Sequence, residues 1–386
     1  MNIIKKSIRA IKAKIQANKD VKIADKILKE YLENVKGKKI LLVSHILSKH
    51  GGSPLTFNRL FYKLLDNGYE PLVLGYNGGD FVEELEQQNI KVILGNVFKD
   101  DKKAFCKIAD NFEKIIANSV VTNTVAYWRN DAIWWIQEAQ NIDNDFMNYM
   151  PHLKDALKNS SKIFVVSDYA KDVVEKYNST CEVIKLGVKD YSKIVTPHTV
   201  KDKIKFMTVG EINDCKAQDV LINAISKLDK KYLEQSEFHL VFERKKGHRF
   251  RYVDKIKKQV GNVYYENIEI NQEKKSQMFE DMDIFVIPSR DESCSLVTLE
   301  ACMLSKPVIV SENVGAKYMV NQEKNGYIVK TGDIDSLKFA IEKIIDNKNL
   351  LDEMGKNSRQ MYENFATESL LENSINRIIE YLETEY

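Results

Sequence analysis

The sequence predicts an α/β protein with two doubly wound parallel sheets in tandem. Short apolar runs alternate with longer amphipathic segments along 386 residues, a length that suffices for two domains with their own cores. The runs are apolar throughout, which indicates strands that helices cover on both faces, as in parallel sheets. Ile40–Ser44 and Ile204–Gly210 each begin a series of strand, glycine-bearing loop and helix.

The first series predicts strands and helices up to Ser167. We expect helices at Leu55–Leu65 and Phe81–Gln88, because apolar residues recur there at helical spacing. The expected strands are Ile40–Ser44, Pro71–Gly75, Val92–Leu94, Lys114–Asn118, Ala132–Ile136 and Lys162–Ser167.

The second series begins after a break near Ile194–Asp202, where Thr196-Pro-His-Thr interrupts the pattern and indicates a linker. A helix is expected at Ala217–Leu228, and the tail from about Asp335 has helical spacing throughout. The expected strands are Ile204–Gly210, Phe238–Phe242, Asn262–Tyr265, Ile284–Ile287 and Val308–Val310.

Composition and charge argue against several classes of protein. The formal net charge of +2 gives no case for nucleic-acid binding by the surface as a whole. The five cysteines are scattered without a CxxC pair, which favours a reducing cytosol and argues against structural zinc. No stretch reaches the ~18 apolar residues that span a bilayer, and the N-terminus lacks the apolar core of a signal peptide. We therefore expect a cytoplasmic enzyme.

Residues 1–37 are predicted to form a basic amphipathic helix, with no acidic residue before Asp20. Isoleucines recur at helical spacing and basic residues occupy the other faces: Ile4, Ile8, Ile11 and Ile15, against Lys5, Lys6, Arg9, Lys12, Lys14 and Lys19. Such a helix can lie on an anionic membrane, to which each basic residue contributes roughly 1 kcal/mol. An ordinary helix that packs on the domain and keeps a solvated basic face is the alternative.

The stretch Pro288–Ser311 carries the strongest functional signal. It reads PSRDESCSLVTLEACMLSKPVIVS and joins two expected strands through a loop and a helix. Glu292 is expected in the loop and Glu300 inside the helix, so both carboxylates can face the crevice at the carboxyl ends of the strands. The start of the helix presents N–H groups at the positive end of the helix dipole, which suits a phosphate.

This pattern resembles the E-x7-E signature of retaining glycosyltransferases of the GT-B fold, family 4, and the resemblance covers most of the chain from about residue 39. It implies two Rossmann-like doubly wound domains that face a central cleft, with a C-terminal helix crossing back to the N-terminal domain. The expected parts are a basic helical segment (1–37), an acceptor-binding domain (38–196), a nucleotide-sugar-binding domain (201–360) and the returning helix (361–386).

The resemblance implies a role for each donor-site residue. Glu300 binds the ribose hydroxyls, Glu292 contacts the transferred sugar, and Lys216 holds the diphosphate as negative charge develops on it. A glycine pair in the first loop permits close approach of a donor phosphate, and Ser295 has a helix cap as its alternative role. The donor is expected to contact Gly51, Gly52, Gly210, Lys216, Ile268, Ser293, Cys294, Ser295, Leu296, Val297 and Glu300.

Two positions of the expected diphosphate clamp depart from the family pattern. Glu211 stands where many relatives carry Arg, and Cys215 stands where a second Arg is common. A nearby basic run is a candidate replacement for the lost charge, although a solvated charged loop is the simpler interpretation: Arg244, Lys245, Lys246, Arg249 and Arg251.

In the N-terminal domain the resemblance points to acceptor contacts at His45, His50, Trp135 and Gln137. Relatives commonly read W-W-I-H-E where this chain reads W-W-I-Q-E, from Trp134 onward. Gln137 can hydrogen-bond a sugar hydroxyl but cannot titrate. That suits front-face retention, in which the leaving phosphate itself accepts the proton of the acceptor. We expect Glu292, Lys216 and Gln137 to be catalytic, whereas the two tryptophans fit the core equally well.

The expected function is that of a retaining glycosyltransferase. It moves a sugar from a nucleotide-diphosphate donor, with UDP-sugar favoured, to a hydroxyl of a bacterial glycan, glycolipid or glycoprotein. No metal or other cofactor is expected, since no DxD triplet follows a strand and Asp281-Met-Asp283 precedes one. Residues 1–20 are expected to contact an anionic membrane at the inner face of the plasma membrane.

Two alternatives stay open. A non-catalytic GT-B subunit that binds an acceptor or a partner enzyme is favoured by Glu211 and Gln137. A UDP-N-acetylglucosamine epimerase of the same fold fits the E-x7-E pattern poorly.

Overall fold

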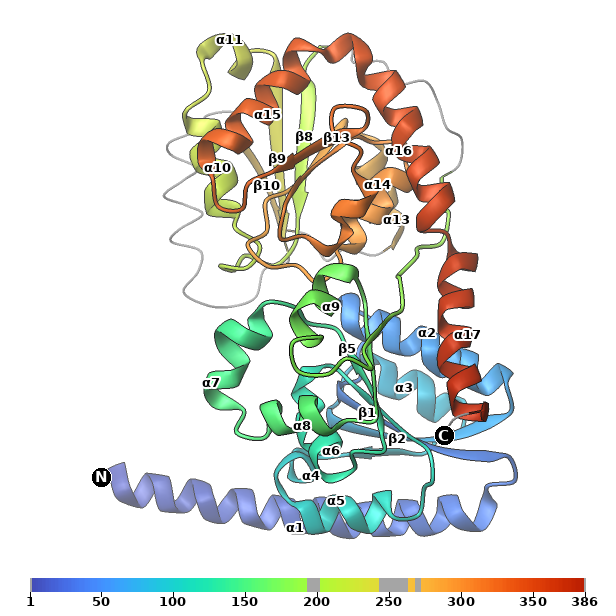
Figure 1. Cartoon of the computed structure of the whole chain (residues 1–386). Helices are drawn as coiled ribbons and strands as arrows, with labels where there is room; N and C mark the ends of the chain where they lie inside the picture. Colours follow the sequence, from blue (N-terminus) through green and yellow to red (C-terminus); the bar gives the residue numbers. More distant parts are fainter. Residues whose placement is uncertain (1, 193–201, 243–262, 268–271, 385–386) are drawn as a thin grey trace. The chain divides into compact units, whose positions relative to one another are not determined.

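The structure is a computed structural model that describes residues 2–192, 202–242, 263–267 and 272–384, without the side chains of residues 2–11, 263–267 and 272–274. The chain forms two compact units (Figure 1). Unit 1 contains Met1–Ile184 and Glu372–Tyr386, and unit 2 contains Lys185–Leu371. The predicted linker lies mostly outside the described residues.

Unit 1 is built on a seven-stranded sheet whose described strands are all parallel, in the order β3-β2-β1-β4-β5-β6-β7. Strand order reverses between β1 and β4, so the switch point of this doubly wound sheet lies at their carboxyl ends. The strands are β1 Lys38–Ile46, β2 Tyr69–Asn77, β3 Val92–Leu94, β4 Ile115–Asn118, β5 Ile133–Ile136, β6 Lys162–Val165 and β7 Glu182–Val183.

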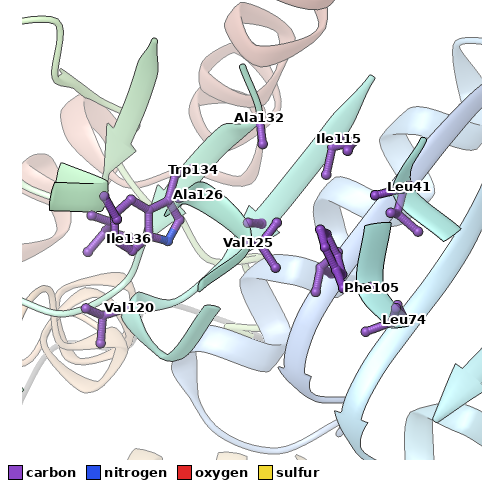
Figure 2. Close-up of a cluster of buried hydrophobic side chains, with 14 of the residues drawn as sticks. Leu41, Leu74, Phe105, Ile115, Val120, Val125, Ala126, Ala132, Trp134 and Ile136 are labelled. Atoms are coloured by element: carbon purple, nitrogen blue, oxygen red, sulfur yellow. The ribbon is translucent and has the colours of Figure 1, made fainter. Parts of the chain in front are cut away.

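Helices cover the sheet of unit 1 and enclose its core. One face packs a cluster of aliphatic and aromatic side chains that includes Leu41, Phe105 and Trp134 (Figure 2). The helical elements are α1 Asn2–Asn34, α2 Gly52–Asp66, α3 Asp80–Gln87, α4 Val97–Asp100, α5 Lys102–Ala109, η1 Val120–Thr122, α6 Asn123–Trp128, η2 Ile142–Phe146, α7 Met147–Tyr149, α8 Leu153–Asn159 and α9 Asp168–Val174.

Unit 2 repeats the architecture with a six-stranded parallel sheet in the order β10-β9-β8-β11-β12-β13, so its switch point lies between β8 and β11. Its strands are β8 Ile204–Val209, β9 Ser236–Phe242, β10 Val263–Asn267, β11 Ile284–Ile287, β12 Val308–Ser311 and β13 Gly326–Val329. Its helical elements are α10 Gln218–Ser226, α11 Lys230–Leu233, α13 Gln272–Glu280, α14 Leu296–Met303, η3 Gly315–Met319, α15 Ile334–Asp346, η4 Lys348–Leu350 and α16 Leu351–Phe365.

The last helix, α17 (Glu368–Thr384), begins in unit 2 and ends in unit 1. In unit 1 the Lys38 ammonium pairs with Glu383 at 2.6 Å, and the Lys114 ammonium donates to the Leu382 carbonyl. Apolar side chains of the same helix are buried: Leu371, Ile375, Ile378, Ile379 and Leu382. The predicted return of the C-terminal helix to the N-terminal domain is confirmed.

The two-sheet α/β prediction is also confirmed, and each expected strand overlaps an observed one. Sequence reasoning missed β7, which has two residues, and β13, which begins at Gly326. A Cβ at Gly326 would lie 1.8 Å from the Val308 carbonyl oxygen, so glycine allows the edge strand to approach β12. Among the described helices none has the length and apolar character needed to cross a membrane.

Candidate functional site

The loop that follows β11 is held in place by backbone hydrogen bonds to the segment after β12. The Glu292 N–H donates to the Asn313 carbonyl at 3.2 Å, and the Gly315 N–H donates to the Glu292 carbonyl at 2.7 Å. One step further, the Ala316 N–H donates to the Cys294 carbonyl at 2.8 Å. The first carboxylate of the E-x7-E motif therefore lies on a braced loop at the carboxyl edge of the sheet.

Ser295 ends this loop and caps α14. Its φ of 86° is unusual for a residue with a side chain, and its hydroxyl accepts hydrogen bonds from the Thr298 N–H at 3.4 Å and the Thr298 hydroxyl at 3.1 Å. The cap role that the sequence left open for Ser295 is thus present. Burial raises the pKa of the neighbouring Cys294 to about 12, so this thiol stays protonated and is no nucleophile at neutral pH.

Lys216 and Glu292 form an ion pair at the switch point of unit 2. The loop after β8 presents Lys216, whose backbone N–H donates to the Asn213 side chain at 2.8 Å. The aliphatic stem of Lys216 passes over Gly210, whose missing Cβ would lie 3.6 Å from two of its carbons. The side chains keep 32% and 16% of their surface exposed, so a ligand can reach the pair. A cation and an anion are thus fixed together where strand order reverses.

Glu300, inside α14, has a carboxylate with only one of its two oxygens hydrogen-bonded among the described residues. The Lys275 ammonium on α13 donates to its Oε1 at 2.5 Å, while Oε2 is buried and has no hydrogen-bond partner among the described residues. Burial raises the pKa of Glu300, and the positive charge of Lys275 opposes that rise. The free lone pairs of Oε2 suit a ligand that brings hydroxyl donors.

Arg290 links the loop after β11 to the loop after β8 through hydrogen bonds, a role that sequence reasoning missed. Its guanidinium donates to the Asp219 carboxylate at 2.8 Å and to the Asp214 carbonyl at 2.9 Å, and its backbone N–H donates to the Cys215 carbonyl at 2.7 Å. The strand-ending triplet Pro-Ser-Arg was the available signal. Sequence reasoning also missed Lys275. No local sequence signal pointed to it, because its partner Glu300 lies 25 positions away.

In unit 1, neutral polar side chains gather at the equivalent switch point. Ser44 lies near the end of β1 and is paired in register with Asn118 at the end of β4. The Gln137 amide, just after β5, donates to Asn118 Oδ1 at 3.1 Å. Asn118 in turn donates to the hydroxyl of Ser53, at the start of α2, at 3.2 Å. Gln137 is 8% exposed and Asn118 is fully buried.

The other residues of the W-W-I-Q-E segment support this edge from within. Trp134 and Trp135 are both fully buried, so the core role that the sequence left open holds for both rings in this structure. The Trp134 indole donates to the Ser119 carbonyl at 2.9 Å. The Glu138 carboxylate accepts from the Ser119 hydroxyl and from the Val120 N–H at 2.8 Å. Burial raises the pKa of Glu138, and the hydrogen bonds from these donors partly oppose that rise.

The two histidines lie apart from that network. His45 follows Ser44 on β1 and is half-buried, and burial, with help from the charge of Lys99, lowers its pKa so that it is neutral at pH 7. His50 is largely exposed and lies 3.0 Å from the Asp80 carboxylate. Gly51 has a φ of 92° and precedes α2, which starts at Gly52.

The expected donor residues divide between the two units. Unit 2 brings together Gly210, Lys216 and Glu292, with Ser293–Val297 leading to Glu300, whereas Gly51 and Gly52 belong to unit 1. Ile268 and the basic run 244–251 lie outside the described residues. No group of three or more potential metal ligands (His, Cys, Asp or Glu) occurs within the described part of the chain.

Two family models match the chain in succession. Residues 36–200 match the model described as glycosyl-transferase family 4, and residues 192–361 match glycosyl transferases group 1. Together the models span most of the chain. The fold is GT-B, with two Rossmann-like domains and a returning helix. The chain belongs to the family 4 glycosyltransferases of this fold.

Solved structures and curated proteins show the same resemblance. Anabaena HepE, solved in complex with UDP, gives a TM-score of 0.70 at 18% identity over 90% of this chain and all of that one. An uncharacterized glycosyltransferase of Methanocaldococcus jannaschii is 28% identical over 56% of this chain and 58% of its own length. The capsular polysaccharide biosynthesis glycosyltransferase CapM of Staphylococcus aureus is 35% identical over 22% of this chain and 23% of its own. This chain thus spans just over half the length of the Methanocaldococcus relative and about a quarter of the length of CapM.

Proposed function

We propose that this protein is a retaining glycosyltransferase that transfers a sugar from a UDP-sugar to a hydroxyl of a bacterial glycan, glycolipid or glycoprotein. The Lys216–Glu292 ion pair at the switch point of unit 2 carries the proposal. It supplies a cation for a diphosphate and an acceptor for sugar hydroxyls within one contact. Names of relatives support the donor and acceptor classes: an Escherichia coli galactosyltransferase, 39% identical over 77 residues, is named for UDP-Gal and a diphosphoundecaprenol acceptor.

In the proposed mechanism, the donor separates the ion pair. Glu292 accepts hydrogen bonds from hydroxyls of the transferred sugar, and the Lys216 ammonium turns to the diphosphate. Because negative charge grows on the leaving diphosphate, a fixed ammonium stabilises the transition state more than the ground state. The acceptor hydroxyl attacks the anomeric carbon from the face that the diphosphate leaves, the bond to the diphosphate oxygen breaks, and that oxygen takes the hydroxyl proton.

The rest of unit 2 holds the nucleotide. Glu300 Oε2 accepts the ribose hydroxyls while Lys275 keeps Oε1 occupied. The start of α14 carries the positive end of the helix dipole. The Thr298 N–H is bonded to the Ser295 cap, and the N–H groups of Leu296 and Val297 suit the distal phosphate. We propose that these groups replace a metal ion and that no cofactor is needed. Transfer is then unchanged when EDTA is added, and activity that requires added Mg²⁺ or Mn²⁺ would contradict this part.

The proposal is tested by nucleotide binding and by transfer. UDP is expected to raise the thermal midpoint of the full chain more than GDP does, and mass spectrometry is expected to show transfer from one UDP-sugar of a donor panel with retained configuration. A chain that no nucleotide diphosphate stabilises would be a non-catalytic subunit instead. Inverted configuration would remove the front-face mechanism.

We also propose that residues 1–20 contact an anionic membrane. Residues 12–16 of α1 are exposed on every side, whereas Ala24, Leu28 and Tyr31 pack into the core of unit 1. The leading part of α1 extends beyond the rest of this unit (Figure 1). Ile15 keeps 52% of its surface exposed. The apolar and basic residues that precede it lie outside the described side chains, so their contribution rests on the sequence.

Vesicle flotation tests this contact. The full chain is expected to float with vesicles that contain phosphatidylglycerol and not with phosphatidylcholine alone. Replacing Lys5, Lys6 and Arg9 by Gln is expected to abolish flotation, whereas the same change at Lys22, Lys26 and Lys29, on the packed half of the helix, leaves it intact. Equal loss in both triple variants would indicate a general charge effect.

A further inference from the structure

A chain of hydrogen bonds in unit 1 starts at a backbone carbonyl and ends at Gln137. The Ser44 hydroxyl donates its hydrogen to the Ile46 carbonyl at 3.1 Å. The Asn118 amide nitrogen lies 3.4 Å from the Ser44 oxygen, and the Gln137 amide nitrogen lies 3.1 Å from Asn118 Oδ1. Ser44 and Asn118 are fully buried, so water does not exchange these partners.

The direction of each bond follows from the first. A carbonyl oxygen can only accept, so the single hydrogen of Ser44 is committed and its oxygen can only accept from Asn118. Asn118 must then present its NH₂ group to Ser44 and its Oδ1 to Gln137. Gln137 must in turn present its NH₂ group to Asn118. The orientation of the Gln137 amide is therefore set by the Ile46 carbonyl, which lies three hydrogen bonds away along this chain of contacts.

We propose that Asn118 is a positioning residue that fixes the polarity of the Gln137 amide and so makes Oε1 of Gln137 an acceptor for a ligand hydroxyl. Ser53, which shares the partner Asn118, adds a donor: its oxygen accepts from Asn118 at 3.2 Å, and its own hydrogen is not used in that bond. A sugar hydroxyl donates and accepts at once and fits this pair. A phosphate oxygen, which only accepts at neutral pH, does not fit Oε1. This inference rests on the proposed function only for the identity of the ligand.

The fixed polarity can be tested without any substrate, by replacing Gln137 with Glu. An ionised carboxylate cannot donate to Asn118, whose orientation Ser44 enforces, so the new carboxyl group keeps its proton and its folded pKa rises. A group with a raised folded pKa stabilises the fold at low pH, and this contribution is lost as pH rises through that pKa. In a Ser44→Ala background Asn118 can turn and donate to the carboxylate, and the Ser53 hydroxyl can rotate to follow.

Tryptophan fluorescence reports this effect in the full chain, because its three tryptophans, Trp128, Trp134 and Trp135, all belong to unit 1. Relative to the parent, Gln137→Glu is expected to increase the urea unfolding constant of unit 1 roughly tenfold to hundredfold between pH 5 and pH 8. In the Ser44→Ala background the increase is expected to stay below about threefold. Equal pH dependence in both backgrounds, or none in either, would overturn the proposal.

Asn178→Asp is the matched control. Asn178 is a buried amide of unit 1 that donates to the Leu157 carbonyl at 2.9 Å and to the Ser160 carbonyl at 2.8 Å. The stability lost on its replacement is expected to be the same with and without Ser44→Ala. If Gln137→Glu does not fold at pH 8, the pH at which unit 1 unfolds replaces the urea measurement. That pH must be higher in the Ser44→Ala background.

Gln137→His tests the ligand. Below a pKa of about 6.5 both ring nitrogens donate, and above it the nitrogen that does not face Asn118 becomes an acceptor. The KM of the substrate whose hydroxyl binds is therefore expected to fall at least threefold from pH 5.5 to pH 7.5, relative to the wild-type profile. A fall confined to the acceptor KM, or to the donor KM, identifies the source of the hydroxyl. A KM that rises with pH would show that this position donates, and would overturn the proposal.

Discussion

The two units have the same doubly wound topology, yet their switch points carry opposite chemistry. In unit 2 the point between β8 and β11 holds charged pairs: Lys216–Glu292, Arg290–Asp219 and, on the helices beside it, Lys275–Glu300. In unit 1 the point between β1 and β4 holds neutral groups: Ser44, Ser53, Asn118 and Gln137.

The difference suits the two switch points to different classes of ligand. Both switch points offer a crevice at the carboxyl ends of parallel strands, and the fold alone assigns no ligand to it. Paired ions can separate to neutralise a charged ligand, and the Lys216–Glu292 pair is partly exposed, which limits the desolvation cost of holding the two charges. A network of amides and hydroxyls instead fixes the direction of each hydrogen bond, which suits an uncharged polyol. On this basis we propose that unit 2 binds the nucleotide diphosphate and that unit 1 binds a sugar hydroxyl.

The largest expected effect is on catalysis, and it tests the charged side of the comparison. Lys216→Ala is expected to lower kcat for sugar transfer about 10²- to 10³-fold, because the charge on the departing diphosphate loses its fixed cation. Lys227→Ala is the control, since this lysine is exposed, pairs with Asp335 at 2.9 Å and lies in the same unit. A loss of less than tenfold for Lys216→Ala would mean that another group supplies the charge.

A smaller effect is expected on nucleotide affinity. Glu300→Gln is expected to weaken UDP binding about 10- to 100-fold, because a hydrogen bond to a charged acceptor contributes about 1.5–3 kcal/mol. Titration calorimetry measures the change. Glu342→Gln, which removes a carboxylate paired with Lys338 in the same unit, is expected to bind UDP as the parent does. Equal affinity of both variants would place the ribose elsewhere.

The pH dependence of binding tests what Lys275 does. Burial already raises the pKa of Glu300, and Lys275→Met removes the charge that opposes the rise. In this variant the carboxyl group stays protonated to a higher pH than in the wild type, so UDP affinity is expected to increase at least threefold from pH 6 to pH 8. Stability changes in the opposite sense, because a raised folded pKa stabilises the fold only below it.

The wild type and Lys338→Met serve as references for that profile. Both are expected to show a flatter pH dependence of UDP affinity than Lys275→Met. A flat profile in Lys275→Met would mean that Glu300 is ionised without help from the lysine.

The smallest expected effect concerns the strained cap of α14. Ser295→Ala keeps the φ of 86° and loses the cap, so it is expected to cost about 1 kcal/mol of unfolding free energy. Ser295→Gly also loses the hydroxyl but relieves the backbone, so its net change is expected to stay within about 0.5 kcal/mol of zero. Scanning calorimetry of the full chain compares the two. A costlier glycine variant would show that the loop needs the hydroxyl for more than the cap.

Much of the fold, and the residues Lys216, Glu292 and Glu300 of the charged site, were predictable from the sequence, because each is marked by a pattern of neighbouring residues. Central strands such as β4, β5, β11 and β12 are short runs whose side chains are all buried, and Glu292 and Glu300 fall on one strand–loop–helix segment. Strands β7 and β13 escaped prediction, since one has two residues and the other begins at a glycine. The partner of Lys216 was also missed, because Glu292 lies 76 positions along the chain.

The sequence by itself thus determined the two parallel sheets, the E-x7-E segment and the return of the last helix. Hydrophobic periodicity is a property of consecutive residues, and it suffices to say which segments are buried. Only the tertiary structure decided which side chains meet: Arg290 with Asp219, Lys275 with Glu300, and Asn118 with Ser44 and Gln137. Strand order brings these distant residues together, and the direction of a hydrogen bond follows from the neighbours that packing supplies.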